Sequence, residues 1–169
     1  MDFMSDELVF VTAETTDPPP ALAAATEDAF FTGAEIDAVR ASWAAATPVN
    51  AKAADAFFEN LFDAYPNLQG PFHVSGGPPK TMLWATVGLI VDNLEDPESL
   101  SLPLRQLGAR HVALGVQDDM YGKFADILLG TIATVFGNGW TDTHETGWEK
   151  ALGFAVTQMR DGAARAEAA

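Results

Sequence analysis

Apolar residues recur at helical spacing along most of this chain, and prolines and glycines divide the pattern into segments. Residues three or four positions apart lie on one face of a helix, so this spacing predicts amphipathic helices. The first segment opens with Thr32-Gly-Ala-Glu35, the spacing of a capping box, and ends before Pro48. No stretch shows convincing strand alternation, and we therefore predict an all-α fold. The expected helices cover about residues 32–47, 50–64, a short turn from 66, 78–94, 104–114, 118–136 and 141–159.

Size and charge limit what the chain can bind. With 169 residues, 48% of them hydrophobic, it is long enough for one domain with a proper core. A formal net charge of −15 argues against nucleic acid and anionic membranes, since both bind clustered Lys and Arg. Because there are no cysteines, disulfides, thiolate metal sites and cysteine nucleophiles are excluded. No basic residue precedes Arg40 and no apolar run approaches the ~20 residues of a membrane span, so we expect a cytoplasmic protein.

The N-terminal residues differ from the rest of the chain. Residues 1–31 contain seven acidic residues and no basic one, and the prolines at 18–20 disfavour regular structure. We predict a mostly disordered acidic extension, within which the apolar residues 8–11 either stay free or pack on the domain. The globular domain is expected over residues 32–160, followed by a short Ala-rich tail over 161–169.

One histidine stands on an otherwise apolar helix face. Leu104, Leu107 and His111 fall at positions i, i+3 and i+7 of a segment that closes with Leu114-Gly115-Val116. A lone histidine in such a place is usually a satisfied core residue, and histidine is also the commonest metal ligand. The 11 phenylalanines, many for this length, indicate a large aromatic interior or an apolar pocket. The periodicity alone leaves both interpretations of His111 open.

Five stretches stand at fixed places along the helical pattern. They are Phe57-Phe-Glu-Asn-Leu-Phe-Asp-Ala-Tyr-Pro66, Phe72, Asn93-Leu-Glu-Asp96, Arg110-His111-Val112 with Gly115-Val116, and Trp148. In this order and at these spacings they resemble the globin family, and are most similar to single-domain bacterial haemoglobins, which are related to the haem domain of flavohaemoglobins. The stretches correspond in turn to the second globin helix with its proline, the haem-stacking phenylalanine, the end of the distal helix, the proximal histidine with its corner, and the last helix. The resemblance covers residues 32–159.

The resemblance implies a globin fold, with six to eight helices around a haem pocket and haem b (iron protoporphyrin IX) as the cofactor. His111 would be the axial ligand of the iron through a neutral imidazole nitrogen, with the other ring nitrogen held by an acceptor. Phe72 would stack on the porphyrin. Lys80 and Arg110 stand near where the family places the propionates, and both also suit a solvated surface. The remaining residues expected at the cofactor are Phe58, Phe62, Leu83, Val87, Leu107, Val116, Tyr121 and Phe124.

The distal side departs from the family pattern. Globins usually carry a distal His or Gln at the position that is here Pro79, and the ligand-stabilising Tyr of bacterial relatives is replaced by Phe58. A distal hydrogen-bond donor would stabilise bound oxygen by roughly 1–3 kcal/mol. Neither proline nor phenylalanine has a side chain that can donate one. The gas site is then open and apolar, or closed by His73 as a sixth ligand, or served by a donor from Tyr121 or Trp84. A globin fold that binds no haem is the remaining alternative.

These inferences indicate a haem-binding, single-domain globin that reversibly binds a diatomic gas: oxygen, carbon monoxide or nitric oxide. We expect a role in oxygen binding or transport or in nitric oxide handling, without enzymatic activity of its own. Nitric oxide dioxygenase turnover needs electrons, and 169 residues leave no room for a reductase domain, so that activity would depend on an external reductase. The alternative is a globin-fold sensor or interaction module, with or without haem. The sequence leaves monomer and homodimer open.

Overall fold

The computed structural model describes residues 29–74 and 78–169, apart from the side chains of Pro71, His73 and Val74. This part of the chain contains seven α-helices and no β-strand, which confirms the predicted all-α class. The α-helices are α2 (Gly33–Ala46), α3 (Asn50–Ala64), α4 (Gln69–Val74), α5 (Lys80–Asp92), α6 (Ser101–Ala113), α7 (Asp118–Phe136) and α8 (Asp142–Ala168). The 3-10 turns are η2 (Thr47–Val49), η3 (Pro66–Leu68), η4 (Pro97–Leu100) and η5 (Gly137–Gly139). The predicted extension lies almost wholly outside the described residues. None of the described helices is both long and apolar enough to cross a membrane.

The first helix begins at the predicted capping box. The Thr32 hydroxyl accepts a hydrogen bond from the Glu35 N–H at 3.1 Å, and the Glu35 carboxylate accepts one from the Thr32 N–H at 2.9 Å. Phe31 and Ile36 flank this cap at the positions of a hydrophobic staple, and both pack in the main core. Phe31 is only 3% exposed, so the folded domain includes this last residue of the expected extension.

Two helices are longer than the sequence pattern predicts. α6 begins at Ser101 directly after η4, whereas the pattern predicts a loop from Asp96 through the following serines. Pro103 is tolerated there because proline suits the first turn of a helix. α8 continues to Ala168, so the residues expected as a tail extend this helix. Gly162 is buried in that extension, because tertiary packing on α6 outweighs the weak helix propensity of glycine.

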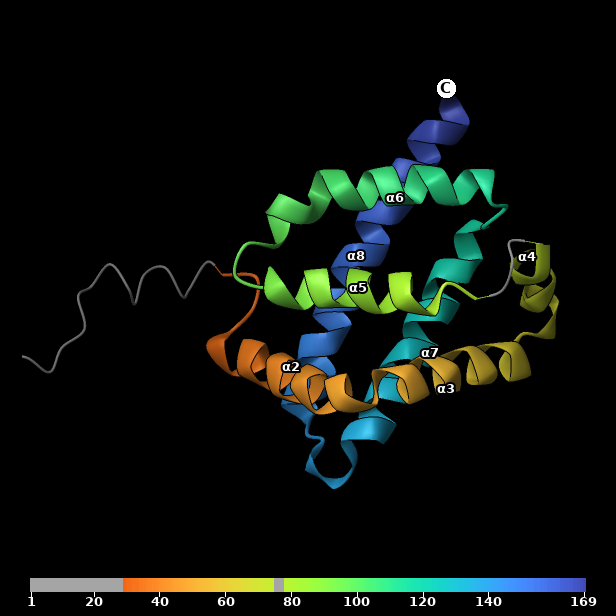
Figure 1. Ribbon diagram of the computed structural model, residues 1–169. Coiled ribbons are helices and arrows are strands. Elements are labelled where there is room, and N and C mark those ends of the chain that lie inside the picture. Colours follow the sequence, from red (N-terminus) through yellow and green to blue (C-terminus); the bar gives the residue numbers. More distant parts are fainter. Residues whose placement is uncertain (1–28, 75–77) are drawn as a thin grey trace, which may run out of the picture.

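The helices cross around a core centred on Trp148 of α8. In the view of Figure 1, α5 passes in front of α7 and α8, with α6 above it and α2 and α3 below it. Trp148 is fully buried, and its indole N–H donates to the Ser42 hydroxyl of α2 at 2.8 Å. α6 packs mainly on α8, whereas α5 packs on α2, α3 and α8. In the described part of the chain α5 and α6 make at most sparse backbone contact with each other.

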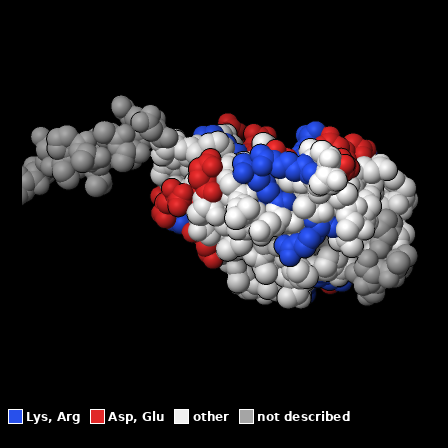
Figure 2. Space-filling model, turned by 90° about the horizontal axis from the view of Figure 1, so that it is seen from above, with Lys and Arg blue, Asp and Glu red and all other residues white. Residues whose placement is uncertain are grey.

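The surface charges are unevenly distributed. Figure 2 looks from above onto α6 and the C-terminal end of α8. Lys and Arg side chains gather in the middle of this face, and acidic side chains lie toward its edges. On this face positive charge is therefore concentrated in the middle, although the formal net charge of the chain is −15.

Candidate functional site

His111 stands in the last turn of α6, just before the chain leaves the helix. Gly115 has a φ angle of 80°, a conformation that favours glycine. The backbone N–H of Gly115 donates to the Val112 carbonyl at 3.0 Å, and that of Val116 donates to the His111 carbonyl at 3.1 Å. These two bonds form a Schellman ending. The corner that the sequence pattern indicates thus fixes where α6 stops, and with it the position of the histidine.

The His111 imidazole is held in one tautomer. Its Nδ1 lies 2.8 Å from the backbone carbonyl oxygen of Leu107. A carbonyl only accepts hydrogen bonds, so Nδ1 must carry the proton and Nε2 keeps a free lone pair. Burial lowers the pKa of His111 below its usual value and the charge of Arg110 adds to this, while the bond to Leu107 opposes it. A neutral, oriented imidazole is the form that binds a metal ion.

Tyr121 of α7 lies beside this imidazole. The two rings are stacked, with centroids 6.3 Å apart and planes inclined by 29°. Its phenol oxygen is buried and has no hydrogen-bond partner among the described residues. Burial raises the pKa of Tyr121, and the charges of Asp118 and Glu167 raise it further. A buried hydroxyl without a partner is uncommon, and packing alone does not explain this one.

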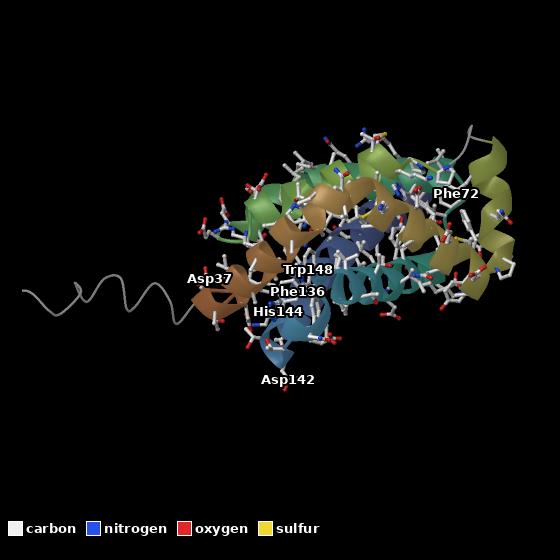
Figure 3. The ribbon with its side chains drawn as sticks, turned by 60° about the horizontal axis from the view of Figure 1, so that its bottom comes forward. Asp37, Phe72, Phe136, Asp142, His144 and Trp148 are labelled. Carbon is white, nitrogen blue, oxygen red and sulfur yellow. The ribbon has the colours of Figure 1, made fainter. Side chains whose placement is uncertain are left out.

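Phenylalanines from three helices form an aromatic cluster at the α4 end of the domain. The Phe72 ring of α4 lies 5.6 Å from that of Phe58 and 5.5 Å from that of Phe62, both on α3. It lies 6.4 Å from the ring of Phe124 on α7. Figure 3 shows Phe72 beside α4, at the far end of the molecule from His144. The structure therefore brings these four predicted site residues together.

The four aliphatic residues expected at the site lie on α5, on α6 and in the corner after α6. Val87 of α5 is buried, whereas Leu83 of α5, Leu107 of α6 and Val116 are only half-buried. Leu83 packs against the main core together with the aromatic cluster. The backbones of α5 and α6 make at most sparse contact in the described residues, although Val87 of α5 and Leu104 of α6 belong to the same core cluster.

The two basic residues expected near the cofactor have different surroundings. Lys80 pairs with Asp55 of α3, and about half of each side chain is exposed. The pair borders a shallow groove of about 170 Å³ that Phe58 and Phe62 also line. Arg110 is exposed and makes no ion pair with any described residue. Arg110 is therefore the more available of the two charges.

Pro79, Trp84 and His73 were considered for the gas side of the site. Pro79 is the exposed residue that precedes α5, and it offers no hydrogen-bond donor. Trp84 is buried and stacked on Trp43 with centroids 4.6 Å apart, in a small cluster distinct from the one that contains Phe58. The Trp84 N–H has no partner among the described residues. The side chain of His73 lies outside the described residues, so its role as a sixth ligand stays a prediction.

His144 has a local role at the start of α8. Its Nδ1 accepts a hydrogen bond from the Thr141 N–H at 3.1 Å, which completes the cap of the helix. The ring packs on Phe136 and Trp140, with centroids 4.8 and 5.3 Å away. Figure 3 shows His144 close to Phe136, toward the turn between α7 and α8. Capping and packing thus account for His144, whereas the free Nε2 of His111 has no such local explanation.

Two glycines that the sequence analysis does not single out fix α6 on α8. A Cβ atom at Gly108 would overlap the Met159 carbonyl, and one at Gly162 would overlap the Arg105 carbonyl. The two helix backbones are therefore in direct contact. Glycine inside a helix costs roughly 0.5–1 kcal/mol relative to alanine. Because this cost needs a reason, Gly108, three residues before His111, could have indicated a close helix contact from the sequence.

Comparisons with known proteins agree with this arrangement. A family model described as Globin matches residues 55–159. The flavohemoprotein of Rhizobium meliloti (strain 1021) is 33% identical over 100 residues, which cover 57% of this chain and 25% of that protein. The flavohemoprotein of Bordetella pertussis (strain Tohama I) is 29% identical over 100 residues, with the same shares of the two chains. The matched region thus spans about a quarter of the length of these relatives.

A solved structure shows the same fold. It is that of ferric Aplysia limacina myoglobin with azide, which is 21% identical to this chain. The two structures align with a TM-score of 0.60, over 78% of this chain and 97% of the myoglobin. The globin model covers more than half of the sequence, and the helices superpose on those of a myoglobin. This chain belongs to the globin family.

Proposed function

We propose that this chain is a haem-binding globin that reversibly binds a diatomic gas. The observation that carries the proposal is the His111 imidazole, which is oriented by the Leu107 carbonyl and left with a free Nε2. The described residues contain no group of three or more His, Asp or Glu side chains that could hold a bare metal ion. A lone imidazole suits an iron whose other positions are filled by a macrocycle, so His111 fits haem better than a bare ion.

The residues predicted for the site fit an apolar disc with two carboxylates. When bound, haem b would supply an iron with an open coordination position for the gas. Phe72 would stack on the porphyrin, and Arg110, which has no described partner, would pair with a propionate. Lys80 would first have to leave Asp55. The walls of the site would be Phe58, Phe62, Leu83, Val87, Leu107, Val116, Tyr121 and Phe124.

Substitution of the histidine tests the proposal. His111→Ala should remove most of the Soret absorbance after reconstitution with haem, because the iron loses its protein ligand. His144→Ala is the matched control, since it removes a half-buried histidine that caps a helix instead. Added imidazole should restore part of the absorbance to His111→Ala. Equal haem retention by the two variants would mean that His111 is not the ligand.

The gas side of the site would lack a hydrogen-bond donor. Phe58 is 4% exposed and surrounded by other phenylalanines, so its position is dry and fixed. Phe58→Tyr should slow oxygen release by roughly 5- to 150-fold, because a phenol donor would add about 1–3 kcal/mol. Stopped-flow displacement of oxygen by carbon monoxide measures this rate. An unchanged rate would place Phe58 away from the gas.

We propose a role in oxygen binding or transport, or in nitric oxide handling, in which an external reductase supplies the electrons for any turnover. The support is that the matched relatives are named flavohemoproteins. Oxygenated protein mixed with excess nitric oxide should therefore consume about one equivalent per haem and then stop. Addition of an electron source, such as a separate reductase with its reductant, should allow further consumption. Sustained turnover without an electron source would contradict this proposal.

A further inference from the structure

α6, which carries His111, differs in charge from the other long helices of the described region. It contains Arg105 and Arg110 and no acidic residue, whereas α2, α3, α5, α7 and α8 each contain at least one Asp or Glu. Against a formal net charge of −15, a helix with only positive charges is an exception that calls for a reason. Arg105 pairs with Asp161 of α8, whereas Arg110 pairs with no described residue.

Two arginines of α8 extend this positive area. Arg160 and Arg165 flank the place where Gly162 contacts the Arg105 backbone, so they lie where α8 crosses α6. We call Arg105, Arg110, Arg160 and Arg165 the arginine patch. Figure 2 shows this face, with blue side chains gathered in its middle.

The carboxylates near the arginine patch neutralise it only in part. Asp161 pairs with both Arg105 and Arg165, at 2.9 and 3.2 Å, so one carboxylate serves two guanidinium groups. Asp118 pairs with Arg160. Glu167, in the last turn of α8, adds one further negative charge. With these three counted, the patch keeps a positive excess.

We propose that the arginine patch is a docking surface for an acidic electron-transfer protein. This inference rests on the proposed function, because only a haem-bound iron gives such a partner something to reduce. The patch includes Arg110, the residue next to His111, so a donor seated there would lie near the proximal side of the site. One electron would pass from the donor's reduced centre to ferric iron, giving ferrous iron and oxidised donor. No bond of the chain would form or break.

The charge distribution also argues for the location of the docking surface. Long-range repulsion from a chain of net charge −15 slows the approach of an acidic protein at most faces. A local positive area attracts the acidic partner instead of repelling it, and orients the partner as it approaches. The main result is a higher association rate. The acidic residues 1–28 of this chain are the competing occupant, and their structure lies outside the described residues.

A matched pair of charge reversals tests the docking surface. Arg165→Glu changes an exposed residue of the patch, and Lys52→Glu makes the same change at an exposed residue of α3 that has no described ion pair. The assay is stopped-flow reduction of the ferric full-length chain by a reduced, strongly acidic plant-type ferredoxin. At ~20 mM ionic strength Arg165→Glu should lower the second-order rate constant about fivefold and Lys52→Glu less than about twofold. The difference should vanish near ~500 mM salt. Equal effects of the two variants would overturn the proposal, since only net charge would then matter.

Docking can also be measured without haem, which separates failure here from failure of the proposed function. Oxidised ferredoxin titrated into the haem-free full-length chain should shift amide NMR signals of α6 and α8, and Arg165→Glu should weaken that binding more than Lys52→Glu does. Because the chain has no cysteines, a nitroxide on Ser5→Cys would report where the N-terminal residues lie. Broadening of α6 and α8 signals that is lost only in Arg165→Glu would assign the patch to the chain's own acidic segment and overturn the proposal.

Discussion

Replacement of Gly108 by alanine should destabilise the domain, because the added methyl group would force two helix backbones apart. An alanine Cβ at this position would lie 2.7 Å from the Met159 Cα and would overlap the Met159 carbonyl. Carbon atoms in contact normally stand ~3.5–4.0 Å apart, so α6 and α8 would have to separate by roughly 1 Å. The obstacle is backbone rather than the end of a flexible side chain, so local rearrangement cannot relieve it.

The expected cost is at the upper end of the range for overpacked cores, about 3 kcal/mol. For a chain of this size that corresponds to a fall in Tm of roughly 6–12 °C. Urea titration and thermal unfolding, both followed by circular dichroism of the haem-free protein, measure it. Haem retention should fall as well, because Gly108 lies one turn before His111.

Gly130→Ala is the matched control. Gly130 lies inside α7, is exposed, and has nothing within 4 Å of an added Cβ. The same chemical change should therefore stabilise the protein by roughly 0.5–1 kcal/mol, through the better helix propensity of alanine. If Gly108→Ala proved as stable as Gly130→Ala, the direct contact between α6 and α8 would be refuted.

Three further predictions concern buried polar groups. Lys150→Met should cost about 1 kcal/mol at pH 7, because Glu35 loses a partner at 2.9–3.0 Å that is itself partly exposed. Burial raises the pKa of Glu35, but the hydrogen bonds from Lys150 and Thr32 outweigh it, so the net shift is downward. Below pH ~4 Glu35 becomes protonated, and the difference in free energy of unfolding between Lys150→Met and wild type should therefore shrink. Ser42→Ala should cost about 1–3 kcal/mol in urea titrations, since it leaves the buried Trp148 N–H unpaired. Burial lowers the pKa of His111, so the unfolded chain takes up a proton at higher pH than the folded one. Haem-free wild type should therefore lose stability relative to His111→Gln as the pH falls from ~7.5 to ~5.5 in urea titrations, and an equal pH dependence of the two proteins would contradict this.

Local signals were sufficient to predict most of the helices. The capping box at Thr32 and Glu35 and the helix over 50–64 depend on residues close in sequence, and the structure has both. The hydrogen bond between Ser42 and Trp148 joins residues 106 positions apart. Neither residue alone indicates it, because a serine in a helix usually faces solvent or its own backbone.

The candidate site was only partly predictable for the same reason. The motif around His111 located the histidine and its corner, since both depend on one helix end. The predicted role of Lys80 depends on what stands opposite it, and its partner Asp55 lies 25 residues away on another helix. The neighbours of Trp84 likewise come from other helices, namely α2, α3 and α7. Pairings of this kind follow from how the helices cross, which periodicity does not specify.

The packing of α6 connects the fold to the proposed function. On one side this helix touches α8 backbone to backbone, at Gly108 and Gly162, and its end is fixed at Gly115. On the other side it makes at most sparse contact with α5 in the described residues, and Leu107 stays half-buried. Full burial of a leucine contributes about 1.5–3 kcal/mol, so the half-buried Leu107 gains only part of that stabilisation. A helix held from behind by α8, with Leu107 half-buried and no described partner on the Nε2 of His111, would suit a flat apolar cofactor on its α5 side.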